Sequence, residues 1–229
     1  MAIRVLASDF GRVIGTFESR AGVVAKLARQ LNTWRQEDQF ELHKLFGVRE
    51  NISPDQEIFY ESLDMGSASV EDLWLQFLAH FGIKEKVCPL EFFRQEWCRH
   101  LQMIEPVVAL YRIVQEKYPI VGISNGDRES LRHFTGLLQT KGRLQFYRLF
   151  LSGFDHQKKP ELFDLAVKNL ARDGIRPQDC VYVDDRPLYV REARRRLFRA
   201  FCFDATAYPT FDEAACHLKS ELAKRGLAA

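Results

Sequence analysis

The sequence lacks the features that mark several classes of protein. No apolar run approaches the roughly 20 residues that a membrane-spanning helix needs, and the stretch from Met1 to Ala7 is too short for the apolar core of a signal peptide. Charge of one sign is also lacking, since 33 Lys and Arg face 31 Asp and Glu for a net charge of +2. This balance provides neither the basic excess that nucleic acid requires nor an acidic tail. We therefore expect no membrane and no nucleic acid among the partners.

Cysteine is scarce and scattered along the chain. The five cysteines are odd in number and include no C-x-x-C pair, which argues against a disulfide framework or a zinc ribbon. They are typical of reduced thiols in a cytoplasmic protein. The six histidines show neither H-x-x-x-H nor H-E-x-x-H spacing, so a histidine metal site is not expected.

The composition that remains is that of a globular protein. Hydrophobic residues make up 46% of the 229 positions and charged residues 28%, which argues against disorder. A chain of this length can form one large domain, or a core domain that carries a smaller insertion. The pattern along the chain decides between the two.

Short apolar runs alternate with helical patterns over most of the chain. Five runs are typical of buried strands: Ile3 to Ala7, Ile120 to Ile123, Leu149 to Leu151, Cys180 to Val183, and Ala200 to Phe203. Helices are predicted between and after the later runs, at residues 107–117, 127–138, 160–172, up to 196, and 211–224. Strands that alternate with helices predict an α/β fold, with a Rossmann-like parallel sheet and helices on both faces.

The segment between the first two runs has a different pattern. No strand is predicted from Gly15 to His100, whereas helix signals recur there. Ser53-Pro54 is typical of a helix start, and Ser69 with Asp72 opens a helix that Gly82 would end. We therefore predict a core domain of residues 1–15 and 101–229, and an inserted all-helical cap domain of residues 16–100.

Polar side chains follow three of the predicted strands. These are Asp9, the pair Ser124-Asn125, and the pair Asp184-Asp185. The carboxyl ends of parallel strands share one edge of a sheet, where ligands bind. Each of these residues alone could serve as an ordinary turn or helix cap. Together, their carboxylates and hydroxyl suit a hard divalent cation and an oxygen-rich anionic ligand, and Lys159 could add positive charge there.

Four motifs in this order resemble those of the haloacid dehalogenase-like (HAD) hydrolase superfamily. The segment Arg4 to Ile14 resembles motif I in its D-x-G-x-V form, with Asp9 as its first residue. Motifs II, III and IV are matched in turn by Ile123-Ser124-Asn125, Lys159-Pro160, and Val181-Tyr182-Val183-Asp184-Asp185. The predicted helical insertion lies where this superfamily carries its C1 cap. The resemblance thus covers nearly the whole chain.

The resemblance implies a Mg²⁺-dependent phosphatase that acts on a small phosphorylated metabolite. Asp9 would be the nucleophile, which forms an aspartyl-phosphate that water then hydrolyses. Lys159 would be the second catalytic residue and would neutralise charge that develops on the phosphate.

The resemblance also implies which residues bind metal and substrate. Mg²⁺ would be held by Asp9, the backbone carbonyl of Gly11, and Asp185, with Asp184 as an alternate ligand or a support. The Ser124 hydroxyl and the Asn125 backbone N–H would hold the phosphate oxygens. Arg12 could also grip the phosphate, because a guanidinium can bind it through two hydrogen bonds.

Three positions depart from the family pattern. Gly11 stands where the commoner phosphatases carry an Asp that serves as general acid and base, a group that typically contributes ~10²–10⁴-fold in rate. Arg12 follows it, where Gly or Asn is common, and Tyr189 replaces an Asp or Asn that would orient the metal ligands or Lys159. We expect such an enzyme to favour good leaving groups, or to use Arg12 or a cap residue as a substitute.

Two other functions are compatible with the motifs. The chain could be a catalytically weak or inactive relative that binds a phosphorylated ligand or a protein partner. It could also be a dehalogenase, although a metal-free dehalogenase has little use for the adjacent carboxylates Asp184 and Asp185. The expected protein is cytoplasmic, and is either a monomer or a homodimer.

Overall fold

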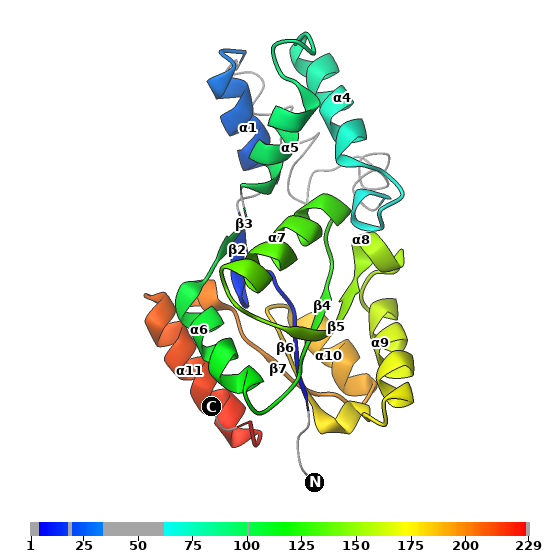
Figure 1. The fold of residues 1–229 in the computed structure, drawn as a ribbon, viewed down its shortest axis with the longest axis vertical. Helices are drawn as coiled ribbons and strands as arrows, with labels where there is room; N and C mark the ends of the chain where they lie inside the picture. Colours follow the sequence, from blue (N-terminus) through cyan, green and yellow to red (C-terminus); the bar gives the residue numbers. More distant parts are fainter. Residues whose placement is uncertain (1–4, 18–19, 34–61, 100, 228–229) are drawn as a thin grey trace.

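The structure is a computed structural model that describes residues 5–17, 20–33, 62–99 and 101–227. Its centre is a sheet of five parallel strands in the order β5-β4-β1-β6-β7 (Figure 1). The strands are β1 (Val5–Ser8), β4 (Ile120–Ser124), β5 (Phe146–Leu151), β6 (Cys180–Asp184) and β7 (Arg199–Cys202). All five apolar runs thus form strands of one sheet, which confirms the predicted α/β fold.

Helices cover both faces of the sheet. One face packs against α6 (Glu105–Gln115), α7 (Arg128–Thr140) and α11 (Phe211–Lys224), and the other against α9 (Glu161–Arg172) and α10 (Pro187–Arg195). Leu6 faces the first group, whereas Val5 and Ala7 face the second. This alternation follows from the two-residue period of a strand and explains why the central strands β1, β4 and β6 are buried at every position. Short helical turns complete the core at α8 (Ser152–Asp155), η2 (Pro177–Asp179) and η3 (Ala205–Ala207).

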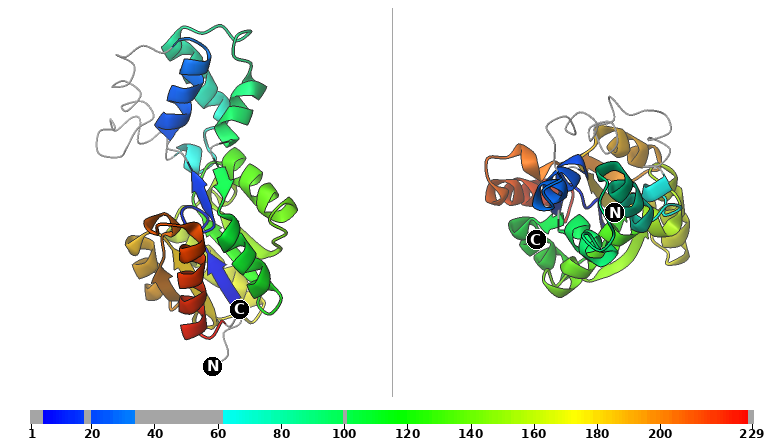
Figure 2. Two further views of the ribbon diagram at one scale, coloured as in Figure 1. Left: turned by 90° about the vertical axis from the view of Figure 1, so that its left-hand side faces the viewer. Right: turned by 90° about the horizontal axis from the view of Figure 1, so that it is seen from above.

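In the described part of residues 20–99, three further helices form a separate unit, here called the cap. They are α1 (Arg20–Gln30), α4 (Val70–Phe81) and α5 (Leu90–Cys98), and their apolar side chains share a core of their own. Figures 1 and 2 place the cap beyond the carboxyl ends of the strands. The predicted capping box is present in α4, where Ser69 and Asp72 bond each other's backbone N–H groups and Gly82 ends the helix in the left-handed region.

One prediction about this region was wrong. No strand was expected from Gly15 to His100, yet β2 (Gly15–Phe17) pairs antiparallel with β3 (Leu101–Met103) where the chain passes between core and cap. Strands of three residues are too short to show an alternating pattern, so only their pairing reveals them. The predicted helix start at Ser53-Pro54 lies outside the described residues. Within the described part of the chain, each helix is too short or too polar to cross a bilayer.

Candidate active site

The register of the sheet brings the ends of β1 and β6 together. Ser8 pairs with Val183, and the Asp9 N–H continues the ladder by donating to the Val183 carbonyl at 2.9 Å. Asp9 therefore lies beside Asp184, on the face of the sheet to which Ala7 points. Asp185 follows directly, and a carboxylate oxygen of each of these aspartates lies within 4.8 Å of the other two. Two strands separated by more than 170 positions thus build one cluster of three carboxylates.

Lys159 provides the positive charge at this cluster. Its Nζ lies 3.2 Å from Asp9 Oδ1 and 2.8 Å from Asp184 Oδ2, and the whole residue is only 4% exposed. Residues 159 and 160 immediately precede α9, which packs beside β4 and β5. A buried ammonium group between two carboxylates offsets part of the repulsion that would otherwise oppose their approach.

The two adjacent aspartates have different surroundings. Asp184 is fully buried, and both of its oxygens are engaged: Oδ2 accepts from Lys159 and from the Tyr182 hydroxyl, and Oδ1 accepts from the Arg186 N–H at 2.8 Å. Asp185 is only partly buried. Asp184 is therefore suited to hold Lys159, whereas Asp185 is suited to meet a ligand.

The crowding of charge shifts the pKa values of the cluster. Burial raises the pKa of Asp185 to about 7, and repulsion from Asp9 and Asp184 adds to the shift. Burial also raises the pKa of Asp9, although Lys159 and a hydrogen bond from Ser124 oppose the shift. For Lys159, burial acts against the charged form, but attraction to Asp9 and Asp184 outweighs it and raises the pKa. Three carboxylates beside one ammonium group leave the cluster with a surplus of negative charge, which a bound cation would offset.

Ser124 and Asn125 come from the end of β4, which is the other neighbour of β1 in the sheet. Ser124 is buried, and its hydroxyl bonds the Asp9 carboxylate. The Asn125 side chain binds protein instead of facing outward. Its Oδ1 accepts from the Lys159 N–H at 2.9 Å, and its Nδ2 donates to the Tyr189 hydroxyl at 3.4 Å. Asn125 therefore ties the end of β4 to the segment that carries Lys159.

Tyr189 lies inside this network, at the position where the family pattern has a carboxylate or amide. The Lys159 Nζ is 4.5 Å from the centre of the Tyr189 ring, and the ring is almost fully buried. An ammonium group over an aromatic face is attracted by the ring's quadrupole, most strongly where water is excluded. Tyr189 thus orients Lys159 through its ring, a contact that the motif comparison alone did not reveal.

The remaining two predicted residues, Gly11 and Arg12, lie in the loop after Asp9. Arg12 has a left-handed backbone (φ 55°), and its N–H donates to the Gly15 carbonyl at 2.7 Å. Its guanidinium pairs with Asp204 at 3.2 Å and is half-exposed. The structure therefore places Arg12 at the same edge of the sheet as the cluster, but engages its charge with the loop after β7.

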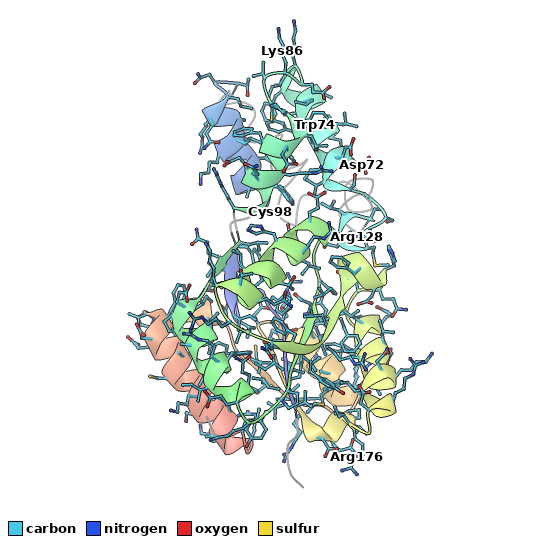
Figure 3. All side chains as sticks on the ribbon, viewed as in Figure 1. Asp72, Trp74, Lys86, Cys98, Arg128 and Arg176 are labelled. Atoms are coloured by element: carbon cyan, nitrogen blue, oxygen red, sulfur yellow. The ribbon has the colours of Figure 1, made fainter. Side chains whose placement is uncertain are left out.

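Sequence reasoning missed the contacts that join this site to the cap. Asp127 caps α7 by accepting from the Ser130 N–H at 2.8 Å, and its other oxygen accepts from Trp97 Nε1 of the cap at 3.4 Å. Within the core itself, Arg128 of α7, labelled in Figure 3, donates to the Gly153 carbonyl of α8 at 3.0 Å. A helix was predicted from residue 127, but no local pattern connects Asp127 with Trp97, which is thirty positions away.

No family model matches the chain, and no curated protein matches it in sequence. Comparison with solved structures shows the fold of HAD-family enzymes. One such enzyme, from Bacteroides thetaiotaomicron, superimposes with a TM-score of 0.66 at 17% identity over 90% of this chain and 95% of its own. The same enzyme has been solved in complex with magnesium and inorganic phosphate.

Two other similar structures show the range of proteins with this fold. A HAD-family hydrolase from Deinococcus radiodurans, solved with bound phosphate and sodium, superimposes with a TM-score of 0.58 at 16% identity over 100% of this chain and 98% of its own. A defluorinating L-2-haloacid dehalogenase superimposes with a TM-score of 0.55 at 15% identity over 88% of this chain and 81% of its own. The fold alone therefore accommodates more than one hydrolytic chemistry.

Proposed function

We propose that this protein is a Mg²⁺-dependent phosphatase of the HAD type that acts on a small phosphorylated metabolite. The observation that carries the proposal is the buried Lys159 ammonium, which touches Asp9 and Asp184 while Asp185 stands beside them. Nucleophile, cation and metal-ligating oxygen are thus within reach of one small anion. The five cysteines are free thiols, which fits a reducing compartment such as the cytoplasm.

The cluster of carboxylates fits the preference of Mg²⁺ for oxygen ligands. Asp9 and Asp185 would hold the ion together with the Gly11 carbonyl, and Asp184 would support them by holding Lys159. When bound, Mg²⁺ supplies positive charge that screens the phosphate from the nucleophile.

The proposed reaction assigns a role to each side chain of the cluster. An oxygen of Asp9 attacks phosphorus, the bond from phosphorus to the leaving oxygen breaks, and an aspartyl-phosphate forms. Lys159 and the Ser124 hydroxyl stabilise the charge on the phosphoryl oxygens, and the Asn125 backbone N–H adds a donor. Water then attacks the aspartyl-phosphate, which releases inorganic phosphate and restores the Asp9 carboxylate.

Phosphate release from a panel of phosphorylated compounds tests this proposal. We expect release that requires Mg²⁺ and is abolished in Asp9→Asn, because an amide cannot attack phosphorus. Asp212→Asn, which changes an exposed aspartate on α11, is the matched control and should retain activity. Binding of phosphorylated compounds without turnover would identify a non-catalytic binding protein instead. Halide release that persists in a chelator would identify a dehalogenase.

A further inference from the structure

The ring of Phe17 covers Gly11, two residues after the proposed nucleophile. A Cβ atom built on Gly11 would lie 2.5 Å from Phe17 Cε1, which is closer than atoms can pack, and 3.3 Å from Cζ. The ring therefore fills the space into which any side chain at position 11 would project. Phe17 is nevertheless 50% exposed, although it is a large apolar side chain. One part of the ring contacts the loop of the candidate active site, and another part is open to solvent or to a ligand.

The backbone holds Phe17 in this position. Gly11 and Gly15 form a β-bridge, so the loop after Asp9 folds back and directs β2 past Gly11. A Cβ atom on Gly15 would lie 2.2 Å from the buried ring of Phe134, so only glycine fits at this point of the turn. Phe17 then pairs with Leu101 across the two-stranded ribbon. Its position is thus set by the path of the chain between core and cap.

A cavity of about 240 Å³ borders Phe17, between the ribbon β2–β3 and helices α1 and α5. Its lining includes two cationic side chains, Lys26 and Arg99, and one carboxylate, Glu96, which pairs with Arg99. The lining therefore carries a net positive charge of one. A group that passes Phe17 into this cavity gains apolar contact from the ring and attraction to positive charge if it is an anion.

From these features we infer that Phe17 contacts the leaving group of the substrate, and that this group departs as a stabilised anion, so that the substrates are aryl or acyl phosphates rather than alkyl phosphates. The inference rests on the proposed function. As Asp9 forms its bond to phosphorus, the electron pair of the breaking P–O bond passes to the leaving oxygen. An aryl oxide or a carboxylate can hold that charge without a proton, whereas an alkoxide cannot. The ring of Phe17 occupies the space of a side chain at position 11 and donates no proton to the leaving oxygen.

The test is the kcat/KM of the Mg²⁺-loaded enzyme for substituted phenyl phosphates, acetyl phosphate and glycerol phosphate. We expect the rate to rise steeply with the acidity of the leaving group. Phenyl phosphates should exceed glycerol phosphate by about 10²-fold or more, which is the contribution of a general acid that Gly11 cannot supply. Equal rates for phenyl and glycerol phosphates would overturn the inference while leaving the phosphatase intact. Failure to release phosphate from every compound would overturn the proposed function and the inference with it.

Variants identify the contribution of the ring. Phe17→Ala should lower the ratio of the kcat/KM values for phenyl and glycerol phosphates about tenfold, chiefly through KM, and Phe17→Leu should lower it less. Gly11→Ala should mimic Phe17→Ala by displacing the ring, with no further loss in the double variant. Phe211→Ala removes a ring of similar exposure on α11 and should leave the ratio unchanged. Because each ratio is measured on one preparation, partial unfolding cancels. An unchanged ratio in Phe17→Ala would refute the role of Phe17.

Discussion

Replacement of Lys159 by methionine is expected to destabilise the metal-free protein by about 3–5 kcal/mol at neutral pH. The ammonium lies 3.2 Å from Asp9 and 2.8 Å from Asp184, and at an effective dielectric constant of about 20 each pair attracts by roughly 5 kcal/mol. Removal of the ammonium from water opposes this attraction by several kcal/mol. Loss of the lysine removes the net attraction that is left after this cost, and it leaves the carboxylates to repel one another.

Urea unfolding, followed by circular dichroism, measures this loss. Mg²⁺ should stabilise Lys159→Met more than it stabilises the wild-type protein, because the ion replaces the missing positive charge. The loss should also shrink as the pH falls below about 7, where Asp185 takes up a proton and the repulsion decreases. Lys168→Met, at an exposed position of α9, is the control and should change stability by less than about 0.5 kcal/mol.

A loss below about 1 kcal/mol for Lys159→Met would refute the reasoning, since a surface ion pair contributes that little. So would a loss that is the same with and without Mg²⁺. In the first case the ammonium would not compensate the carboxylates, and in the second the carboxylates would not bind the metal.

Three further predictions concern the surroundings of the cluster. Mg²⁺ affinity should fall up to about tenfold per pH unit below about 7, because Asp185 must lose a proton to bind metal. Calorimetric titration at several pH values measures this pH dependence of the affinity, which should be weaker in Asp185→Asn. Tyr189→Leu should weaken the binding of inorganic phosphate about tenfold by releasing Lys159 from the ring, whereas Tyr189→Phe should retain most of the affinity; an equal loss in both would contradict this role. Trp97→Phe should lower the free energy of unfolding by about 1 kcal/mol, because the cap loses its hydrogen bond to Asp127. The same change should raise KM more than it lowers kcat, and an unchanged KM in steady-state kinetics would contradict this role of Trp97.

The centre of the sheet was predictable from sequence because strands β1, β4 and β6 are buried on both faces. An uninterrupted apolar run such as residues 120–123 needs no knowledge of its neighbours, and the helix caps at Ser69 and Asp127 are equally local. The short strands β2 and β3 have no comparable signal in the local sequence. They exist because Gly15 lets the chain pass close to Phe134, and that proximity belongs to the folded molecule.

The residues of the cluster could be predicted from the sequence, but the hydrogen bonds and ion pairs among them could not. Parallel strands made it certain that Asp9 and Asp184 would share an edge. Asp184 differs from Asp185 in being fully engaged by protein groups, and one of these groups is the Tyr182 hydroxyl, which donates to Asp184. The two-residue spacing of Tyr182 and Asp184 places both on one face of β6 and is a signal that could have been used. The position of the Tyr189 ring over Lys159 depends on how α10 packs, which no local spacing encodes.

The ribbon of β2 and β3 also determines how the two parts of the molecule can change. Phe17 and Leu101 face each other in register, so the chain leaves the core and returns to it at points roughly 5 Å apart. In the topology of the chain, residues 18–100 connect β2 to β3 as the loop of a hairpin connects its two strands. Closing such a loop depends only weakly on its length, so segments can be gained or lost there without disturbing the sheet. The residues that would select a substrate can therefore diverge while the carboxylate that would attack it stays in place.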